Sequence, residues 1–191
     1  MNNKNHQFNN KYFKQYIYHL AQSENIFQKL NQIKKILITV KKNKSKILIF
    51  GNGGSAAIAS HFSVDLTKNA KIRCTNYNES NLITCFSNDF GYEHWVEMAI
   101  KYYGNKGDVL IVISSSGKSK NMINACIAAR KKKFSKIITL TGHLVNNPVK
   151  KLADINLWVN SKAYNYIENI HQFWLLSLVD LIIGNKNYLP K

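Results

Sequence analysis

The stretch 46–60, KILIFGNGGSAAIAS, constrains the fold most, because an apolar run leads into a glycine-rich turn and then into small residues. Residues 47–50 have the composition of a short strand buried on both faces of a parallel sheet. Glycines in the turn allow positive φ and let a ligand approach the backbone, and Ser55 offers a hydroxyl to a helix cap or a ligand. The stretch therefore predicts a strand, a turn and a helix N-terminus that surround one anion. The alternative is a tight turn with no ligand.

A second turn of this kind follows another apolar run, in the sequence ISSSGKSK at 113–120. Clustered hydroxyls and backbone N–H groups at a helix N-terminus suit a phosphate. Neither a Walker loop nor GxGxxG is present, so we expect no nucleotide and no organic cofactor. Two such turns at the carboxyl ends of neighbouring strands predict one shared site.

The remainder of the chain alternates between helical and strand patterns. Residues 1–10 are polar and expected to be frayed, and 11–42 form a helical arm with Ser23 as a break or N-cap. Strands are expected at 47–50, 72–77, 108–113, 136–141 and 154–159, helices at 56–68, 92–103, 121–132, 147–152 and 168–183, and an unassigned element at 81–86 that ends at the turn 87–91. This order predicts an α/β fold, a doubly wound parallel sheet sandwiched by helices. We expect one domain, with 1–45 as an arm for oligomer packing and 46–191 as the main body.

The amino-acid composition limits the kinds of molecule that this protein is expected to bind. The net charge of +17 invites nucleic acid, but only Arg73 and Arg130 among 27 basic residues are arginine, the residue that phosphate and base recognition favours. No apolar run reaches the ~18–20 residues of a membrane span, and the polar N-terminus does not resemble a signal peptide. The three cysteines are isolated and lack metal-ligand spacing. We therefore expect a cytoplasmic protein that binds neither membranes nor nucleic acid.

Five motifs together resemble one family: GNGGS at 51–55, HFxxDLT at 61–67, SNDFGY at 87–92, KGDVLIVISSSGKS at 106–119 and ITLTG at 138–142. They are similar to the SIS (sugar isomerase) fold and, within it, to the phosphoheptose isomerase group. The resemblance implies interconversion of sedoheptulose 7-phosphate and a heptose 7-phosphate aldose for surface polysaccharide. It also implies a homotetramer with active sites at subunit interfaces. The substrate-binding residues that it implies are Asn52, Gly53, Ser55, Asn88, Asp89, Ser114, Ser115, Ser116, Ser119 and Gln172.

Such an isomerase needs a base and an acid for proton transfer between C1 and C2. His61 and Asp65 stand at i and i+4, so they share one helix face just after the first turn. In the family this HxxxE position supplies a metal ligand and the catalytic carboxylate. Asp65 is shorter by one methylene. The competing interpretation is a His–Asp pair on a helix surface.

The last helix departs further from the family pattern. With Ile170 and His171 as anchors, the family's glutamine position becomes Glu168 and its later histidine becomes Leu176. A family aspartate just upstream falls near Asn165. His171 is offset from the face of Glu168 and is expected to contact another subunit.

Glu168 is expected to be a site residue, because a carboxylate on an apolar helix is costly unless it is paired or liganded. Two interpretations stay open. His61, Asp65 and Glu168 could hold Zn²⁺, with water or Gln172 completing the set. Equally, Asp65 and Glu168 could be the catalytic base and acid without a metal.

The leading hypothesis is a sugar-phosphate isomerase of the phosphoheptose type, acting on a phosphorylated heptulose. The alternative is a SIS-fold tetramer that binds a phosphosugar or a protein, such as a replication initiator, without catalysis. Partial loss of the family's polar groups does not decide between the two.

Overall fold

The computed structural model describes residues 3–21 and 24–187, and its centre is a five-stranded parallel sheet in the order β2-β1-β3-β4-β5. The strands are β1 (Ile47–Gly51), β2 (Cys74–Thr75), β3 (Val109–Ser114), β4 (Lys136–Thr141) and β5 (Ile155–Trp158). In register, Gly51 pairs with Ile113 and Ser114 pairs with Thr141, so the carboxyl ends of β1, β3 and β4 lie at one edge of the sheet. The predicted doubly wound α/β fold is confirmed.

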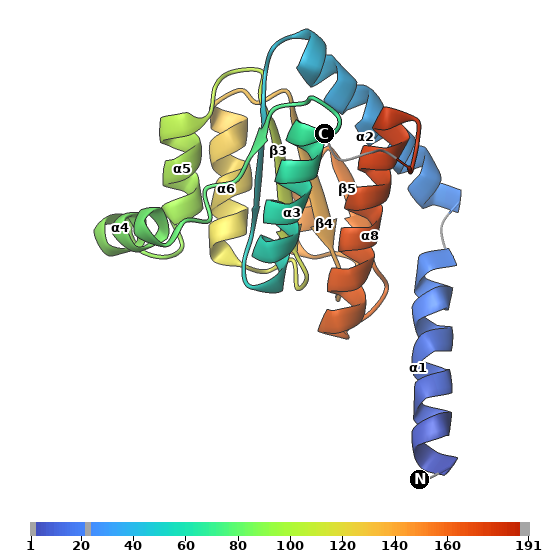
Figure 1. Cartoon of the computed structure of the whole chain (residues 1–191). Coiled ribbons are helices and arrows are strands. Elements are labelled where there is room, and N and C mark those ends of the chain that lie inside the picture. The colour runs from blue at the N-terminus through green and yellow to red at the C-terminus, as the bar shows by residue number, and fades with distance from the viewer. Residues whose placement is uncertain (1–2, 22–23, 188–191) are drawn as a thin grey trace.

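Helices cover both faces of this sheet (Figure 1). One layer consists of α2 (Glu24–Lys42), α3 (Gly54–Lys68) and α8 (Tyr164–Ile183). The other consists of α4 (Ser80–Phe90), α5 (Trp95–Tyr103), α6 (Lys120–Lys131) and the single turn α7 (Pro148–Lys151). Alternate residues of β3 supply both cores: Val109, Ile111 and Ile113 pack under the first layer, and Leu110 and Val112 under the second. This two-sided burial is why the strands appear in the sequence as unbroken apolar runs.

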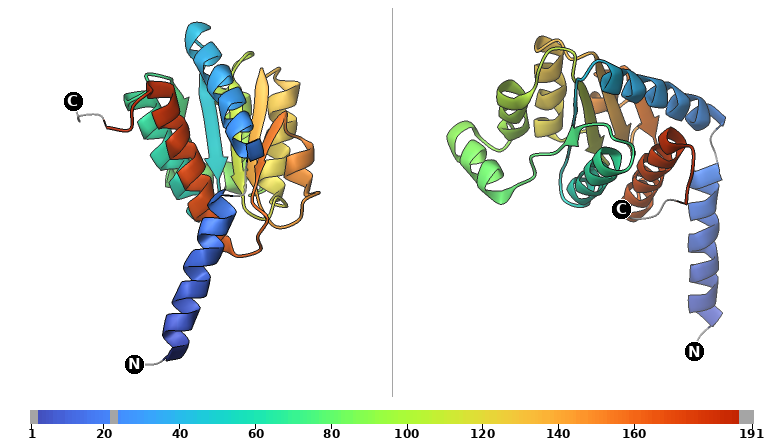
Figure 2. Two further views of the ribbon diagram at one scale, coloured as in Figure 1. Left: turned by 90° about the vertical axis from the view of Figure 1, so that its right-hand side faces the viewer. Right: turned by 45° about the horizontal axis from the view of Figure 1, so that its top comes forward.

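The N-terminal helix α1 (Asn3–Ala21) stands away from the body of the molecule (Figures 1 and 2). Its main anchor is Tyr166 of α8, whose hydroxyl donates to the carbonyl of Tyr12 at 2.9 Å. The rings of the same two residues lie 4.7 Å apart. By contrast, α2 belongs to the core: Ile26, Leu30, Ile33, Leu37 and Val40 are all buried, at the spacing of one helix face.

Several boundaries differ from the sequence prediction. Residues 3–10 are helical rather than frayed, because extending an existing helix costs little once its first turn has formed. Ser23 lies outside the described residues. The expected strand at 72–77 is only Cys74–Thr75, and α8 begins at Tyr164 rather than at 168. The unassigned element at 81–86 is α4, which continues through the expected turn to Phe90 and ends at Gly91 with φ 86°.

Candidate active site

A cavity of about 140 Å³ lies at the carboxyl ends of β1 and β3. It is bounded by both predicted anion-binding turns and by the first turns of α8. Its lining residues are Asn52, Ser55, Ile113, Ser114, Ser115, Ser116, Ser119, Tyr164 and Glu168. The two turns therefore meet in one site, as the sequence predicts.

The β1–α3 turn contributes Asn52 and the buried Ser55. Gly53 has a φ of 54°, a backbone conformation that favours glycine. In this turn the backbone amide of Ser55 donates to the carbonyl of Asn52, and that of Ala56 donates to the carbonyl of Gly53. Gly54 begins α3 directly beside Glu168 of α8, since a Cβ at Gly54 would collide with Oε2 of Glu168. The missing side chain thus lets a carboxylate approach the N-terminus of α3.

The β3–α6 turn contributes four hydroxyls. Ser114 Oγ lies 3.5 Å from Ser119 Oγ, and Ser116 Oγ accepts a hydrogen bond from the amide of Lys118 at 3.3 Å. Ser115 is buried and its Oγ has no hydrogen-bond partner within the described chain. A buried, unpaired hydroxyl is costly. An oxygen-rich ligand in the cavity would satisfy it.

From α8, Glu168 and Tyr164 line the cavity one helical turn apart. Glu168 is half-buried, and this burial raises the pKa of its carboxyl above the usual value. A carboxyl whose pKa is raised toward neutrality is better suited to both remove and return a proton. It is the one carboxylate among the lining residues.

Tyr164 was missed by the sequence analysis, because the last helix was expected to begin only at Glu168. The available signal was spacing: Tyr164, Glu168, Gln172 and Leu176 recur every four residues along α8. Leu176, which stands where the family has its histidine, continues this row.

His61, Asp65 and Gln172 form a second polar cluster between α3 and α8. His61 Nε2 lies 3.4 Å from Asp65 Oδ2, and Gln172 Nε2 lies 3.5 Å from His61 Nδ1. The side chain of His61 is 49% exposed and that of Asp65 is 24% exposed. None of the three lines the cavity.

The proposed zinc ligands do not come together in this chain. Across residues 3–21 and 24–187, no group of three His, Cys, Asp or Glu side chains is placed to hold a metal ion. His61 and Asp65 are adjacent, but Glu168 points to the N-terminus of α3 instead of joining them. The set His61, Asp65 and Glu168 therefore does not fit Zn²⁺ within one chain.

Asn88 and Asp89 are also placed away from the cavity. Both are exposed in the last turn of α4, where Asn88 Nδ2 donates to Asp89 Oδ1 at 3.0 Å. Gly53 does not line the cavity either. Of the expected substrate-binding residues, the structure brings together Asn52, Ser55 and the four serines.

His171 does not reach another subunit, contrary to expectation. It is fully buried within its own chain, where Nε2 lies 3.2 Å from the carbonyl oxygen of Thr141, the last residue of β4. Burial lowers the pKa of its imidazole to about 4. The offset of one position on α8 turns this side chain into the core instead of toward solvent.

His171 should make the protein less stable in acid. Its imidazole titrates near 6.5 when unfolded and near 4 when folded, so between these values the unfolded chain binds the extra proton. We expect this group to remove about 3 kcal/mol of unfolding free energy as the pH falls from 7 to 4, with the loss levelling off below 4. Urea titrations across this pH range measure it.

The comparison variant is His171→Gln, which keeps a donor for Thr141 but cannot titrate. Its unfolding free energy should depend much less on pH than that of the native chain. An identical slope in His171→Gln would contradict the assignment.

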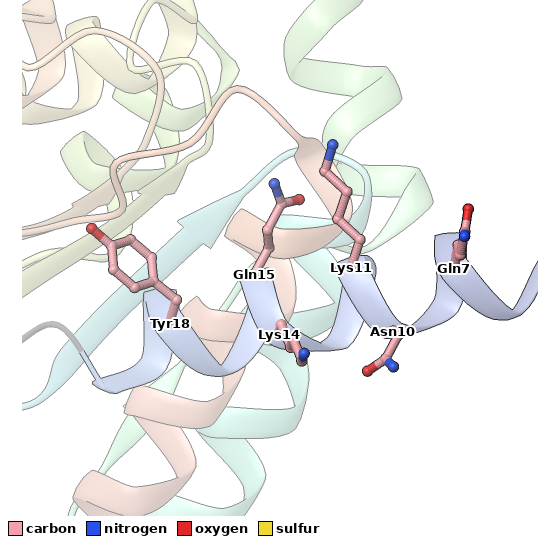
Figure 3. A pocket seen from close by; sticks show the side chains of 6 residues that line it. All are labelled: Gln7, Asn10, Lys11, Lys14, Gln15 and Tyr18. Carbon is pink, nitrogen blue, oxygen red and sulfur yellow. The ribbon is translucent and has the colours of Figure 1, made fainter.

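A larger hollow, of about 440 Å³, lies along α1 (Figure 3). All six lining side chains come from that helix: Gln7, Asn10, Lys11, Lys14, Gln15 and Tyr18. No carboxylate or histidine is among them. The cavity at the strand ends is therefore the better candidate despite its smaller volume.

Comparison with known proteins agrees with this geometry. The SIS domain family matches residues 11–142. A phosphoheptose isomerase of Glaesserella parasuis is 42% identical over 150 residues, 75% of this chain and 77% of its own length. One from Helicobacter pylori is 36% identical over 165 residues, 83% of this chain and 85% of its own. The solved phosphoheptose isomerase of Neisseria gonorrhoeae superposes with a TM-score of 0.87 at 27% identity, covering 94% of this chain and 98% of that one.

The fold is that of an α/β protein with a cavity at the carboxyl ends of its parallel strands. The chain belongs to the SIS domain family and, within it, to the phosphoheptose isomerases.

Proposed function

We propose that this protein is a ketose–aldose isomerase that converts sedoheptulose 7-phosphate into a heptose 7-phosphate aldose. The observation that carries the proposal is a single cavity in which two polar turns, one with a single serine and one with four, face one carboxylate, Glu168. The turns suit the phosphate, and the carboxylate suits the reacting carbons. Relatives named phosphoheptose isomerase support the substrate class.

In the proposed reaction, a carboxylate removes a proton from C1 of the ketose, and the electron pair of the C–H bond forms the C1–C2 double bond. The π pair of the C2 carbonyl moves onto its oxygen, which takes up a proton to give an enediol. The carboxylic acid then returns its proton to C2, while the C1 hydroxyl loses its proton and forms the carbonyl of the aldose, so that the proton lost by the C1 oxygen balances the one gained by the C2 oxygen. Glu168 is proposed to serve as this base and acid in turn. By the family's HxxxE pattern, Asp65 is proposed as the second proton-transfer group, although within one chain Asp65 lies outside the cavity that Glu168 lines. The family's histidine is absent at Leu176.

The test is incubation of the full chain with sedoheptulose 7-phosphate, with and without Zn²⁺, while aldose formation is followed. Turnover is expected. Binding of the sugar phosphate without turnover in either condition would reject the isomerase and favour a phosphosugar-binding protein. A rate that requires Zn²⁺ would show that ligands beyond those assembled within one chain complete a metal site.

The proposed setting is the cytoplasm, with the product feeding heptose into lipopolysaccharide or capsule. Within the described residues, no helix is both long enough and apolar enough to cross a membrane.

We also propose that the molecule is a homo-oligomer, a tetramer by resemblance, with α1 packed against a second copy. Phe13 and Ile17 share one face of α1, and both side chains are 62% exposed. An apolar helix face that stands away from its own domain needs a partner to cover it.

Light scattering coupled to size-exclusion chromatography tests this assembly. The native chain should elute as an oligomer, and the double variant Phe13→Asp/Ile17→Asp should dissociate. Lys14→Asp, on the same helix but without apolar surface, is the matched control. A native chain that is monomeric at micromolar concentrations would refute the proposal.

A further inference from the structure

Asn121 is a buried asparagine in the first turn of α6, and it lies behind the cavity rather than in its lining. Its side-chain amide forms a reciprocal pair with Asn52: Asn52 Nδ2 donates to Asn121 Oδ1 at 3.1 Å, and Asn121 Nδ2 donates to Asn52 Oδ1 at 2.9 Å. The hydroxyl of Tyr92 donates to the same Asn52 oxygen at 3.2 Å. These three side chains form what is here called the amide clasp.

The amide clasp joins three segments that are far apart in sequence. Asn52 belongs to the β1–α3 turn, Asn121 follows the β3–α6 turn, and Tyr92 lies between α4 and α5. The first two segments supply the serines of the cavity, and the third directly follows Asn88 and Asp89. No backbone hydrogen bond among the described residues outside regular elements links the two turns to each other.

Counting donors and acceptors shows what the amide clasp does to Asn52. An amide has two N–H donors and one oxygen with two lone pairs. Both lone pairs of Asn52 Oδ1 are used, one by Asn121 and one by Tyr92, and one N–H is used by Asn121. A single N–H donor therefore remains for the cavity. Asn52 can only donate to a ligand oxygen there.

Burial indicates that Asn121 serves this purpose. Its exposed fraction is 2%, and an unpaired amide in such a position is costly. Both of its side-chain hydrogen bonds in the described chain go to Asn52. We infer that Asn121 is a positioning residue: it orients Asn52 toward the sugar phosphate and holds the two anion-binding turns at a constant separation.

The inference rests on the proposed function for the identity of the ligand. The experiment is a double-mutant cycle on binding, measured by calorimetry with sedoheptulose 7-phosphate and, separately, with inorganic phosphate. The chains compared are native, Asn52→Ala, Asn121→Ala and the double variant. We expect Asn121→Ala to weaken binding of the sugar phosphate about tenfold. In the Asn52→Ala background it should have little further effect, because it acts through Asn52.

Tyr92→Phe removes only the exposed hydroxyl and keeps the ring, so it serves as a second variant if Asn121→Ala does not fold. It should weaken binding about threefold, again only when Asn52 is present. Asn124→Ala is the matched control on α6. Asn124 donates to the carbonyl of Glu93 at 2.9 Å and does not touch Asn52, so binding should be unchanged.

An equal loss on Asn121→Ala in both backgrounds would overturn the inference, since a merely structural role predicts additive effects. Binding without turnover by the native chain would reject the isomerase, but the binding affinities of the four chains could still be compared and would still test the role of Asn121. A native chain that binds neither ligand would overturn both proposals.

Discussion

Replacing Glu168 with Gln should reduce kcat by about 10²- to 10⁴-fold while leaving binding of the sugar phosphate nearly intact. The amide keeps the size of the side chain but neither accepts nor returns a proton at the reacting carbons. Its place in the cavity, against the N-terminus of α3, is unchanged. Initial rates and calorimetric binding on the same preparation separate the two effects.

Two further variants sharpen this result. Glu97→Gln is the control: it alters a glutamate of α5 that pairs with Lys101 and His94 outside the cavity, and its kcat should match the native value.

Asp65→Asn tests the other proposed proton-transfer group, and we expect a loss of kcat comparable to that in Glu168→Gln. An undiminished kcat in Glu168→Gln would remove the catalytic role from the cavity carboxylate.

Replacing Asp108 with Ala should lower the free energy of unfolding by about 3–5 kcal/mol, because it leaves a charge without its buried partner. Asp108 is 2% exposed. Its carboxylate accepts from the Lys46 ammonium at 2.7 Å, from the Lys46 amide at 3.0 Å and from the Asn105 amide at 2.8 Å. These contacts join the beginnings of β1 and β3, the two strands whose far ends lead into the two turns that line the cavity. Urea unfolding at neutral pH measures the loss.

The matched control is Arg130→Ala, which breaks the half-exposed ion pair between Arg130 and Asp154. Surface pairs of this kind contribute about 0–1 kcal/mol, so the control should lose far less stability. An equal loss of unfolding free energy in the two variants would show that the buried Asp108–Lys46 pair stabilises the fold no more than a surface pair does.

The strands were the most predictable part of the fold. β3 and β4 appear within one residue of their expected bounds, because strands buried on both faces need unbroken apolar runs. The helix boundaries were less predictable. Residues 87–90 were expected to be a turn, yet they continue α4, since packing of Phe86 and its neighbours against the second core outweighs the weak helix propensity of Asn88 and Asp89.

The candidate site was likewise predictable only in part. The part formed by the two turns was predictable, because both turns follow strands, and parallel strands end at one edge of the sheet. The part that depends on α3 and α8 was not. Whether Glu168, Asp65 and His61 share one cluster depends on how α8 packs on α3, and that packing directs Glu168 into the cavity and leaves the other two outside it.

The sequence alone therefore determined the α/β architecture, the two glycine- and serine-containing turns and the family, because these follow from local patterns of apolar runs, glycines and serines. Only the tertiary structure decided the inward turn of His171, the contribution of Tyr164 and the amide clasp of Asn52, Asn121 and Tyr92. Each of these joins segments distant in sequence. Such contacts are set by helix packing, which no local pattern specifies.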